Sequence, residues 1–186
     1  MDQAYWQQRY IDGATGWDVG IISNPLKAYI DHLTNKDVRI LIPGCGFGHE
    51  AIYLANQGFT HVTVIDLVDD ALQKLRESYP EVNSVTGDFF THEGAYDLIL
   101  EQTLFCAILP EKREEYIKKV AELLADGGTY AGVLFDRDFE GGPPFGGTAT
   151  EYAGYLKPHF STFKLEPCYN SIDARKGTEV FVIAKK

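Results

Sequence analysis

Segments with the pattern of strands alternate with amphipathic, helix-like segments along most of the chain. Five segments have the strand pattern, the third more weakly than the others: residues 38–43, 61–67, 82–88, 95–102 and 129–136. Residues 49–57, 69–80 and 110–128 have the apolar spacing of helices. Strand and helix therefore follow one another repeatedly. This alternation predicts an α/β sheet whose core strands are parallel.

Both ends of the chain depart from this alternation. Residues 1–23 predict one or two helical turns and a loop, and Asn24 and Pro25 then begin a helix to about Thr34. Near the other end, a loop (141–148) and a helix (149–159) precede two strands, 160–170 and 179–186. Only eight residues join these strands, too few for a parallel crossover, so they predict an antiparallel hairpin. We expect one domain over residues 1–186, with seven strands and helices on both faces of the sheet.

Composition narrows the classes of partner. The chain has 186 residues, 45% of them hydrophobic, and a net charge of -10, which disfavours binding to a nucleic-acid backbone. It has no apolar run long enough for a membrane span and no signal-peptide pattern at its start. Cys45, Cys106 and Cys168 are far apart and odd in number, which argues against a disulfide framework or a metal site. We therefore expect a cytoplasmic, monomeric protein that acts on a small molecule.

A glycine-rich turn after the first predicted strand indicates a nucleotide-like cofactor. Gly44, Gly46 and Gly48 have the spacing G-x-G-x-G, and His49 stands where the dinucleotide fingerprint needs its third glycine. The shorter spacing fits a turn that does not wrap a pyrophosphate. This favours S-adenosyl-L-methionine (SAM) over NAD, while a tight turn with no ligand stays open.

Two aspartates follow the next strands. Asp66 ends the second strand and can accept hydrogen bonds from both ribose hydroxyls, although NAD has the same ribose and a helix-capping role is the alternative. Asp88 follows the third strand, where SAM-dependent enzymes bind the adenine amino group. A terminal antiparallel hairpin is typical of SAM-dependent methyltransferases. No tyrosine has a lysine four residues later, as short-chain dehydrogenases require, and the chain is too short for a separate substrate domain. A Rossmann oxidoreductase is therefore the least favoured interpretation of the sequence.

Four separated motifs carry a family resemblance. The segment WQQRYIDGATGWD (6–18) resembles the N-terminal signature of the thiopurine S-methyltransferase superfamily. LIPGCGFGHE (41–50), LFCAILPEKR (104–113) and GGPPF (141–145) are similar to its halide/thiol methyltransferase branch, known from plants. The motifs occur in the family's order. The resemblance implies a class I, Rossmann-like SAM-dependent methyltransferase (EC 2.1.1.-) that releases S-adenosyl-L-homocysteine.

The resemblance also implies a set of cofactor-binding positions, with residues 1–23 covering the cofactor. The aromatic residues of that segment face the sulfonium, the glycine loop meets the methionine part, and residues after the later strands meet the ribose, the adenine and the methionine end. These positions are Trp6, Tyr10, Trp17, Gly44, Gly46, Asp66, Leu67, Asp88, Phe89, Glu101 and Gln102.

The acceptor is expected at the end of the fourth strand, against Gln102, Phe105 and Phe135. Halide-methylating relatives have tyrosines at the positions of Gln102 and Phe135, so a thiol sulfur is the favoured acceptor. Ile42 stands where most SAM enzymes have an acidic residue, a departure that this superfamily shares. We assign no catalytic base and no metal, and we interpret Arg113 as an exposed helix residue. Alternatives are a SAM-binding protein without turnover, or a methyltransferase for a halide or a small O or N acceptor.

Asp136 and Asp138 follow the fifth predicted strand and could assist deprotonation, but solvated loop acids are the simpler interpretation. The nucleic-acid amino-methyltransferase motif [DN]-PP-[YF] belongs after the fourth strand, where this chain has EQTL instead. Residues 143–145 read PPF only after the fifth strand, which excludes that class of methyltransferase.

Overall fold

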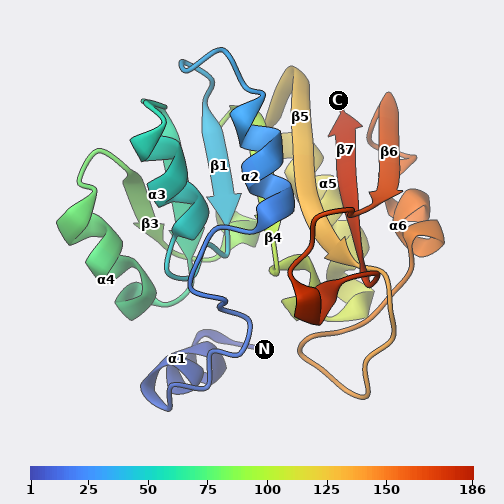
Figure 1. Ribbon diagram of the computed structural model, residues 1–186, viewed down its shortest axis with the longest axis horizontal. Helices are drawn as coiled ribbons and strands as arrows, with labels where there is room; N and C mark the ends of the chain where they lie inside the picture. The colour runs from blue at the N-terminus through green and yellow to red at the C-terminus, as the bar shows by residue number, and fades with distance from the viewer.

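The chain forms one seven-stranded sheet with the order β3-β2-β1-β4-β5-β7-β6, seen in a computed structural model that describes residues 1–186 (Figure 1). The strands are β1 (Ile40–Pro43), β2 (Val62–Asp66), β3 (Asn83–Thr86), β4 (Tyr96–Gln102), β5 (Leu124–Phe135), β6 (Thr162–Pro167) and β7 (Glu179–Lys185). The first five strands pair in parallel, and β7 is antiparallel to both β5 and β6. The predicted, mostly parallel sheet with a terminal antiparallel hairpin is confirmed.

Helices cover both faces of this sheet. The six helices of the chain are α1 (Gln3–Ile11), α2 (Asn24–Asp31), α3 (His49–Asn56), α4 (Asp69–Ser78), α5 (Arg113–Leu123) and α6 (Ala149–Leu156). Short 3-10 turns are η1 (Phe89–Thr91), η2 (Phe105–Ala107), η3 (Pro110–Lys112) and η4 (Asp173–Arg175). One apolar core lies under α2, α3 and α4, and the other lies under α5 and α6. Helix α1 packs on neither face, but lies past the ends of the strands (Figure 1).

Burial on both faces explains the continuous apolar runs of the central strands. In β1, Ile40 and Ile42 belong to the core under α2–α4, and Leu41 belongs to the core under α5 and α6. All four residues of β1 are buried. A parallel strand that is covered on both sides has no position where a polar side chain reaches water. The same arrangement places every carboxyl end of the parallel strands at one edge of the sheet.

The prediction of one long helix over residues 110–128 is wrong at both ends. Its first turn is the 3-10 turn η3, and α5 ends at Leu123. Leu124 takes an extended conformation, is buried, and pairs with Tyr96 of β4. Burial of Leu124 in the sheet outweighs the helical pattern around it, and the glycines lie in an irregular start of β5 instead of stopping a helix. Helix α2 also ends three residues before the predicted Thr34.

The three cysteines are buried and free. None of the helices combines the length and the apolar character that crossing a membrane would need.

Candidate active site

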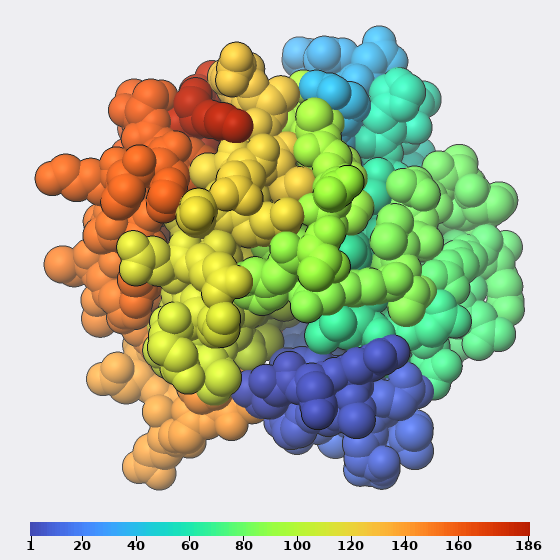
Figure 2. Space-filling view, turned by 180° about the vertical axis from the view of Figure 1, so that it is seen from behind, coloured from blue at the N-terminus to red at the C-terminus, as the bar shows by residue number.

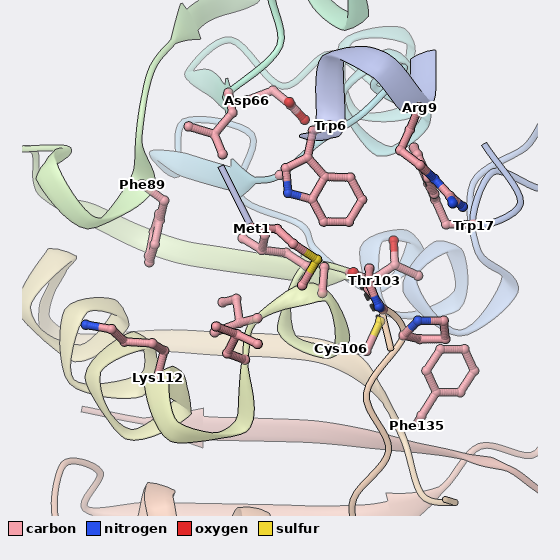
Figure 3. A pocket seen from close by; sticks show the side chains of 18 of the residues that line it. Met1, Trp6, Arg9, Trp17, Asp66, Phe89, Thr103, Cys106, Lys112 and Phe135 are labelled. Carbon is pink, nitrogen blue, oxygen red and sulfur yellow. Dashed lines mark hydrogen bonds between the residues drawn. The ribbon is translucent and has the colours of Figure 1, made fainter. Parts of the chain in front are cut away.

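A cavity of about 940 Å³ opens at the carboxyl ends of the parallel strands (Figure 3). Its lining comes from the N-terminal segment, the glycine loop, the ends of β2 and β4, η1, η2 and the loop after β5. Segments distant in sequence therefore meet at one edge of the sheet, as the topology of a parallel sheet dictates. Of the expected positions, those that line this cavity are Trp6, Tyr10, Trp17, Gly44, Asp66, Leu67, Asp88, Phe89 and Phe135.

The glycine loop brings backbone to the cavity edge without a side chain. Gly44 has a φ of +59°, and a Cβ there would lie 2.8 Å from Cδ1 of Leu104. Both the backbone conformation and the close approach of Leu104 therefore require glycine. Gly46 also has a positive φ, of +54°, and its N–H donates to Asp66 Oδ2 (2.9 Å). This bond fixes the loop against the end of β2.

Asp66 is a desolvated carboxylate with acceptor capacity to spare. It accepts from the Gly46 N–H and, through Oδ1, from the Val68 N–H (3.0 Å). Burial raises the pKa of Asp66, and the backbone donors oppose that rise. An ionised carboxylate offers about four lone-pair positions, so two bonds leave room for ligand hydroxyls. The side chain points toward the cavity in Figure 3.

Asp88 and Phe89 form the neighbouring part of the wall. Asp88 Oδ1 accepts from the Phe90 N–H (2.9 Å) and so caps the 3-10 turn η1, which leaves its second oxygen available. Phe89 is nearly buried, and its ring centroid lies 5.0 Å from that of Tyr116. A flat apolar ring beside an unused carboxylate oxygen suits a heterocycle with an exocyclic amino group.

The N-terminal segment covers the cavity with a cluster of aromatic rings. Trp6 and Tyr10 each meet Trp17 edge to face, with centroid distances of 5.5 and 5.6 Å, and Tyr10 also meets Phe47. Arg9 lies 5.7 Å from the Trp17 ring. Burial raises the pKa of Tyr10, so its phenol stays protonated and neutral. The aromatic faces and the protonated phenol make this side of the cavity suitable for a cation.

Two contacts between polar side chains hold this segment to the helices beside the cavity. Gln7 Nε2 donates to Asp70 Oδ2 of α4 (2.5 Å). His49 Nε2 of α3 lies 2.8 Å from Asp18 Oδ1. Seen from behind, the N-terminal residues lie across the lower edge of the molecule, next to yellow-green and teal segments (Figure 2). The cover is therefore attached by side chains at its edges, because no residue of α1 is fully buried.

Four expected residues lie elsewhere, two of them in the protein core and two at a smaller cavity. Glu101 is fully buried and accepts from the Phe105 N–H (2.8 Å) and the Tyr116 hydroxyl. Phe105 is 2% exposed and packs edge to face against Tyr116 and Tyr152. The structure therefore brings neither Glu101 nor Phe105 into the cavity, because both side chains point into the protein core.

Gln102 and Gly46 line a smaller neighbouring cavity of about 40 Å³, which also borders Ser23 and Gly44. Gln102 Oε1 and Ser23 Oγ are buried there without a hydrogen-bond partner. Buried polar atoms are almost always paired, so these two atoms mark a place for a polar ligand group or water. Two unpaired acceptors beside the glycine loop fit an ammonium group.

The end of the cavity beyond Gly44 is more apolar, and most of it was not predicted. It includes Cys106, Phe135, Phe139, Pro143 and Pro144, and the guanidinium groups of Arg137 and Arg175 lie over the Phe139 and Phe135 rings, respectively. The GGPPF motif was the only sequence signal for the prolines. Arg175 lies in the linker between β6 and β7, which gave no signal, and its Nη2 donates to the Trp17 carbonyl (3.0 Å).

The titratable groups at this end do not form a nucleophile or a metal site. Burial raises the pKa of the Cys106 thiol to about 12, so it stays protonated at neutral pH. Asp136 Oδ1 accepts from the Ala149 N–H (2.9 Å) at the start of α6. Asp138 is exposed. No cluster of three His, Cys, Asp or Glu side chains gathers in a way that could hold a metal ion.

Arg113 is not the exposed helix residue that its sequence position predicts. Its side chain is 1% exposed, and it donates to the carbonyls of Phe145 and Gly146. The surface pattern of α5 hides this role, because the partners are backbone atoms of a loop more than thirty residues away.

Comparison with known proteins gives consistent results. The family described as Thiopurine S-methyltransferase (TPMT) matches residues 1–183. Thiocyanate methyltransferase 1 of Brassica oleracea is 32% identical, over 96% of this chain and 83% of that protein. A thiopurine S-methyltransferase of Vibrio parahaemolyticus is 26% identical, over 97% of this chain and 94% of that protein. A Burkholderia thailandensis 1,6-didemethyltoxoflavin-N1-methyltransferase has a similar fold, with a TM-score of 0.77 at 21% identity over 99% of this chain and 86% of that one.

Proposed function

We propose the reaction of this chain from one premise: it belongs to the thiopurine S-methyltransferase family. It is a SAM-dependent methyltransferase that acts on a small molecule, and the acceptor atom is a sulfur. The observation that carries this proposal is one cavity with two different ends. Asp66, Asp88 and Phe89 line one end, and apolar residues around Phe135 line the other.

The residues present fit SAM. Asp66 would accept the ribose hydroxyls, and Asp88 and Phe89 would hold the adenine. The backbone at Gly44 and the unpaired Gln102 oxygen would receive the methionine part. Trp6, Tyr10 and Trp17 would face the sulfonium, a contact worth roughly 0.5–2 kcal/mol for an aromatic ring and a cation. Bound SAM supplies a methyl group that is activated by the positive sulfur.

The residues of the chain itself position the acceptor and keep water out of the site. Methyl transfer is an in-line displacement whose leaving group needs no proton, so the main tasks are to align the acceptor and to exclude water. The N-terminal aromatic cluster and the proline loop enclose the cavity from two sides. The protonated Cys106 does not compete as a nucleophile. An acceptor thiol that ionises by itself near neutral pH needs no base from the protein.

Sulfur is favoured over halide for two reasons. The relatives named above carry names that describe sulfur acceptors, thiocyanate and thiopurine. In addition, a small hard anion such as chloride needs close hydrogen-bond donors to offset its desolvation. Phe135 offers no donor, Gln102 lines the neighbouring small cavity instead, and the nearby guanidinium groups of Arg137 and Arg175 lie over the Phe139 and Phe135 rings. A polarisable thiolate on an apolar carrier loses less in this environment, and Phe135 can pack against that carrier.

The test is a panel of acceptors in one SAM-dependent assay. We expect kcat/KM for thiophenol, hydrosulfide and thiocyanate to exceed the values for iodide and chloride by at least tenfold. A halide as the best substrate would contradict the sulfur proposal. Calorimetry with SAM and S-adenosylhomocysteine completes the test. Binding without turnover of any thiol, oxygen or nitrogen acceptor would identify a SAM-binding protein without activity.

We further propose that the protein acts as a monomer in the cytoplasm and does not bind nucleic acid. The free cysteines suit a reducing compartment, and the net charge of -10 opposes a polyanion. Light scattering at assay concentration tests the monomeric state, and a salt-titrated binding assay tests whether nucleic acid binds.

A further inference from the structure

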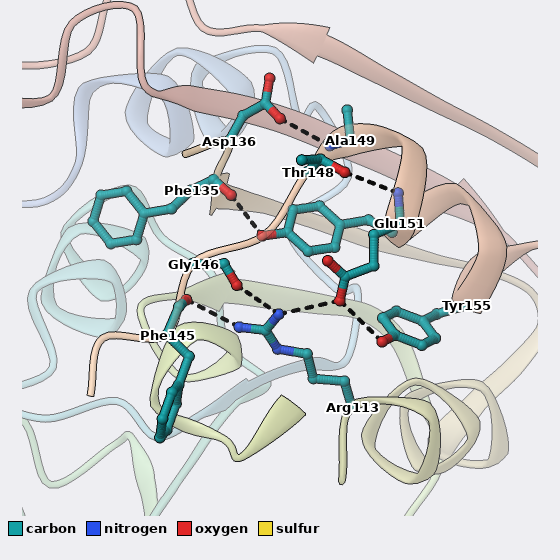
Figure 4. A network of polar contacts seen from close by, with 10 residues as sticks. Arg113, Phe135, Asp136, Phe145, Gly146, Thr148, Ala149, Glu151 and Tyr155 are labelled. Carbon is teal, nitrogen blue, oxygen red and sulfur yellow. Dashed lines mark hydrogen bonds and ion pairs between the residues drawn. The ribbon is translucent and has the colours of Figure 1, made fainter. Parts of the chain in front are cut away.

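The guanidinium of Arg113 is buried at a junction that the chemistry proposed above does not use. Arg113 begins α5, yet its side chain extends away from that helix toward the loop after β5 (Figure 4). Nη1 donates to the Gly146 carbonyl (2.8 Å), and Nη2 donates to the Phe145 carbonyl (2.9 Å). A buried cation is costly unless it is paired and hydrogen-bonded. The Arg113 guanidinium therefore needs, besides these two carbonyls, a partner that neutralises its charge.

The neutralising partners come from two other elements. Glu151 of α6 lies 3.4 Å from Nη1 and also accepts from the Tyr155 hydroxyl (2.9 Å). The guanidinium carbon lies 4.8 Å from the Phe105 ring and 5.9 Å from the Tyr152 ring. One cation thus joins η2, the loop and α6 to α5. This arrangement explains why Phe105 is buried here and does not reach the cavity.

Two of the elements held by Arg113, η2 and the loop after β5, supply part of the apolar end of the cavity, and the third, α6, contacts the backbone of Phe135 in its wall. Cys106 follows Phe105 directly in η2, and its carbonyl accepts from the Phe145 N–H (2.6 Å). Pro143 and Pro144 immediately precede Phe145. The Tyr152 hydroxyl donates to the carbonyl of Phe135 (2.6 Å). Arg113 therefore contacts none of the cavity, but it orders the backbone on which these wall residues stand.

Close packing within the loop makes its shape specific. A Cβ on Gly146 would lie 2.4 Å from the carbonyl oxygen of Arg137, and a Cβ on Gly147 would lie 2.5 Å from the Tyr152 hydroxyl. Gly147 also donates to the Arg137 carbonyl (3.0 Å). The loop can thus pack only with the backbone path that Arg113 holds. In contrast, the N-terminal cover on the opposite side is attached by side chains at its edges.

We propose that Arg113 is a positioning residue for the methyl acceptor: by binding two loop carbonyls it fixes the wall formed by Phe135, Phe139, Pro143 and Pro144. This inference rests on the proposed function, because it assigns the apolar end of the cavity to the acceptor. In this role Arg113 sets the affinity for the acceptor and leaves the affinity for the cofactor unchanged. The planar guanidinium matters, because a lysine ammonium at this position keeps the charge but cannot reproduce two fixed, parallel bonds.

The experiment compares Arg113→Lys with Arg39→Lys. Arg39 makes a two-point contact with Asp97, but it lies in solvent at the opposite edge of the sheet, so it is a matched control. For Arg113→Lys we expect the KM of thiophenol to rise at least tenfold and kcat to change less. The Kd for SAM should stay within twofold of the wild type. Hydrogen exchange of residues 137–147 should become at least tenfold faster, while residues 44–66 keep their protection.

The outcomes separate this inference from the proposed function. Unchanged exchange in residues 137–147, or an unchanged thiophenol KM in an active enzyme, would overturn the role of Arg113. Equal losses of SAM and acceptor affinity would also overturn it, since they indicate general destabilisation. If Arg113→Lys does not fold, Glu151→Gln weakens the same junction and should raise KM at least twofold, and an unchanged KM would refute the inference. A wild-type enzyme that methylates no thiol would instead refute the proposed function, and the exchange measurement still decides whether Arg113 orders the loop.

Discussion

Replacing the buried Glu101 with glutamine should change how stability depends on pH. Glu101 is fully buried in the core beneath β4, and burial raises its pKa to about 7 against an ordinary value of 4.5. The Tyr116 hydroxyl and the Phe105 N–H oppose that rise without cancelling it. Between these two pH values the folded protein holds a proton that the unfolded chain has lost. Stability therefore falls as pH rises from 4.5 through 7.

The size of this effect follows from the shift. One pKa unit corresponds to about 1.4 kcal/mol, so a rise from 4.5 to about 7 contributes about 3 kcal/mol of lost stability by pH 8. Glutamine resembles the protonated acid in shape and has no charge to desolvate. We expect Glu101→Gln to match the wild type near pH 4.5 and to exceed its unfolding free energy by about 3 kcal/mol at pH 8.

Urea unfolding at four or more pH values between 4.5 and 8 measures this difference. Glu166→Gln is the matched control, because it makes the same chemical change on an exposed position of β6. Its stability curve should run parallel to that of the wild type. Parallel curves for Glu101→Gln and the wild type across this range would refute the reasoning, since they would mean that Glu101 keeps an ordinary pKa in the folded protein.

Two further predictions concern the cofactor end. Asp66→Ala should weaken SAM binding by roughly 1–3 kcal/mol, because ligand hydroxyls and the Gly46 N–H lose their acceptor; calorimetry measures this, with the exposed Asp126→Ala as control, and an unchanged Kd would remove Asp66 from the site. Residues 1–20 should exchange amide hydrogens more slowly when SAM is bound, because the aromatic cluster then packs on the ligand; equal exchange with and without SAM would argue against a covering role.

The sequence predicted the sheet and the edge at which Gly44, Asp66 and Asp88 meet, because both depend on local patterns. Continuous apolar runs indicate strands that are buried on both faces. Parallel strands bring Gly44, Asp66 and Asp88 to one edge of the sheet even where the exact strand ends are predicted imprecisely. The order of strands and helices was enough to predict that these three residues lie at one edge.

The apolar end of the cavity could not be predicted in the same way. Glu101 and Gln102 are neighbours in sequence, but consecutive residues at a strand end point in opposite directions, so one is buried in the core and the other borders a cavity. Arg113 looks like a surface residue because its partners are carbonyls of a distant loop. Leu124 follows a helical pattern, yet pairing with Tyr96 draws it into β5. Each of these outcomes depends on long-range packing.

The position of β7 between β5 and β6 has a consequence for biosynthesis. β7 leaves the ribosome after the other six strands of the sheet, but it lies between β5 and β6. Until it emerges, the long strand β5 presents an unpaired edge, and β6 has no neighbour at all. Unpaired strand edges attract other chains. The nascent protein therefore passes through an aggregation-sensitive stage, and β7 must emerge before the sheet closes and the loop that carries Arg175 reaches the site.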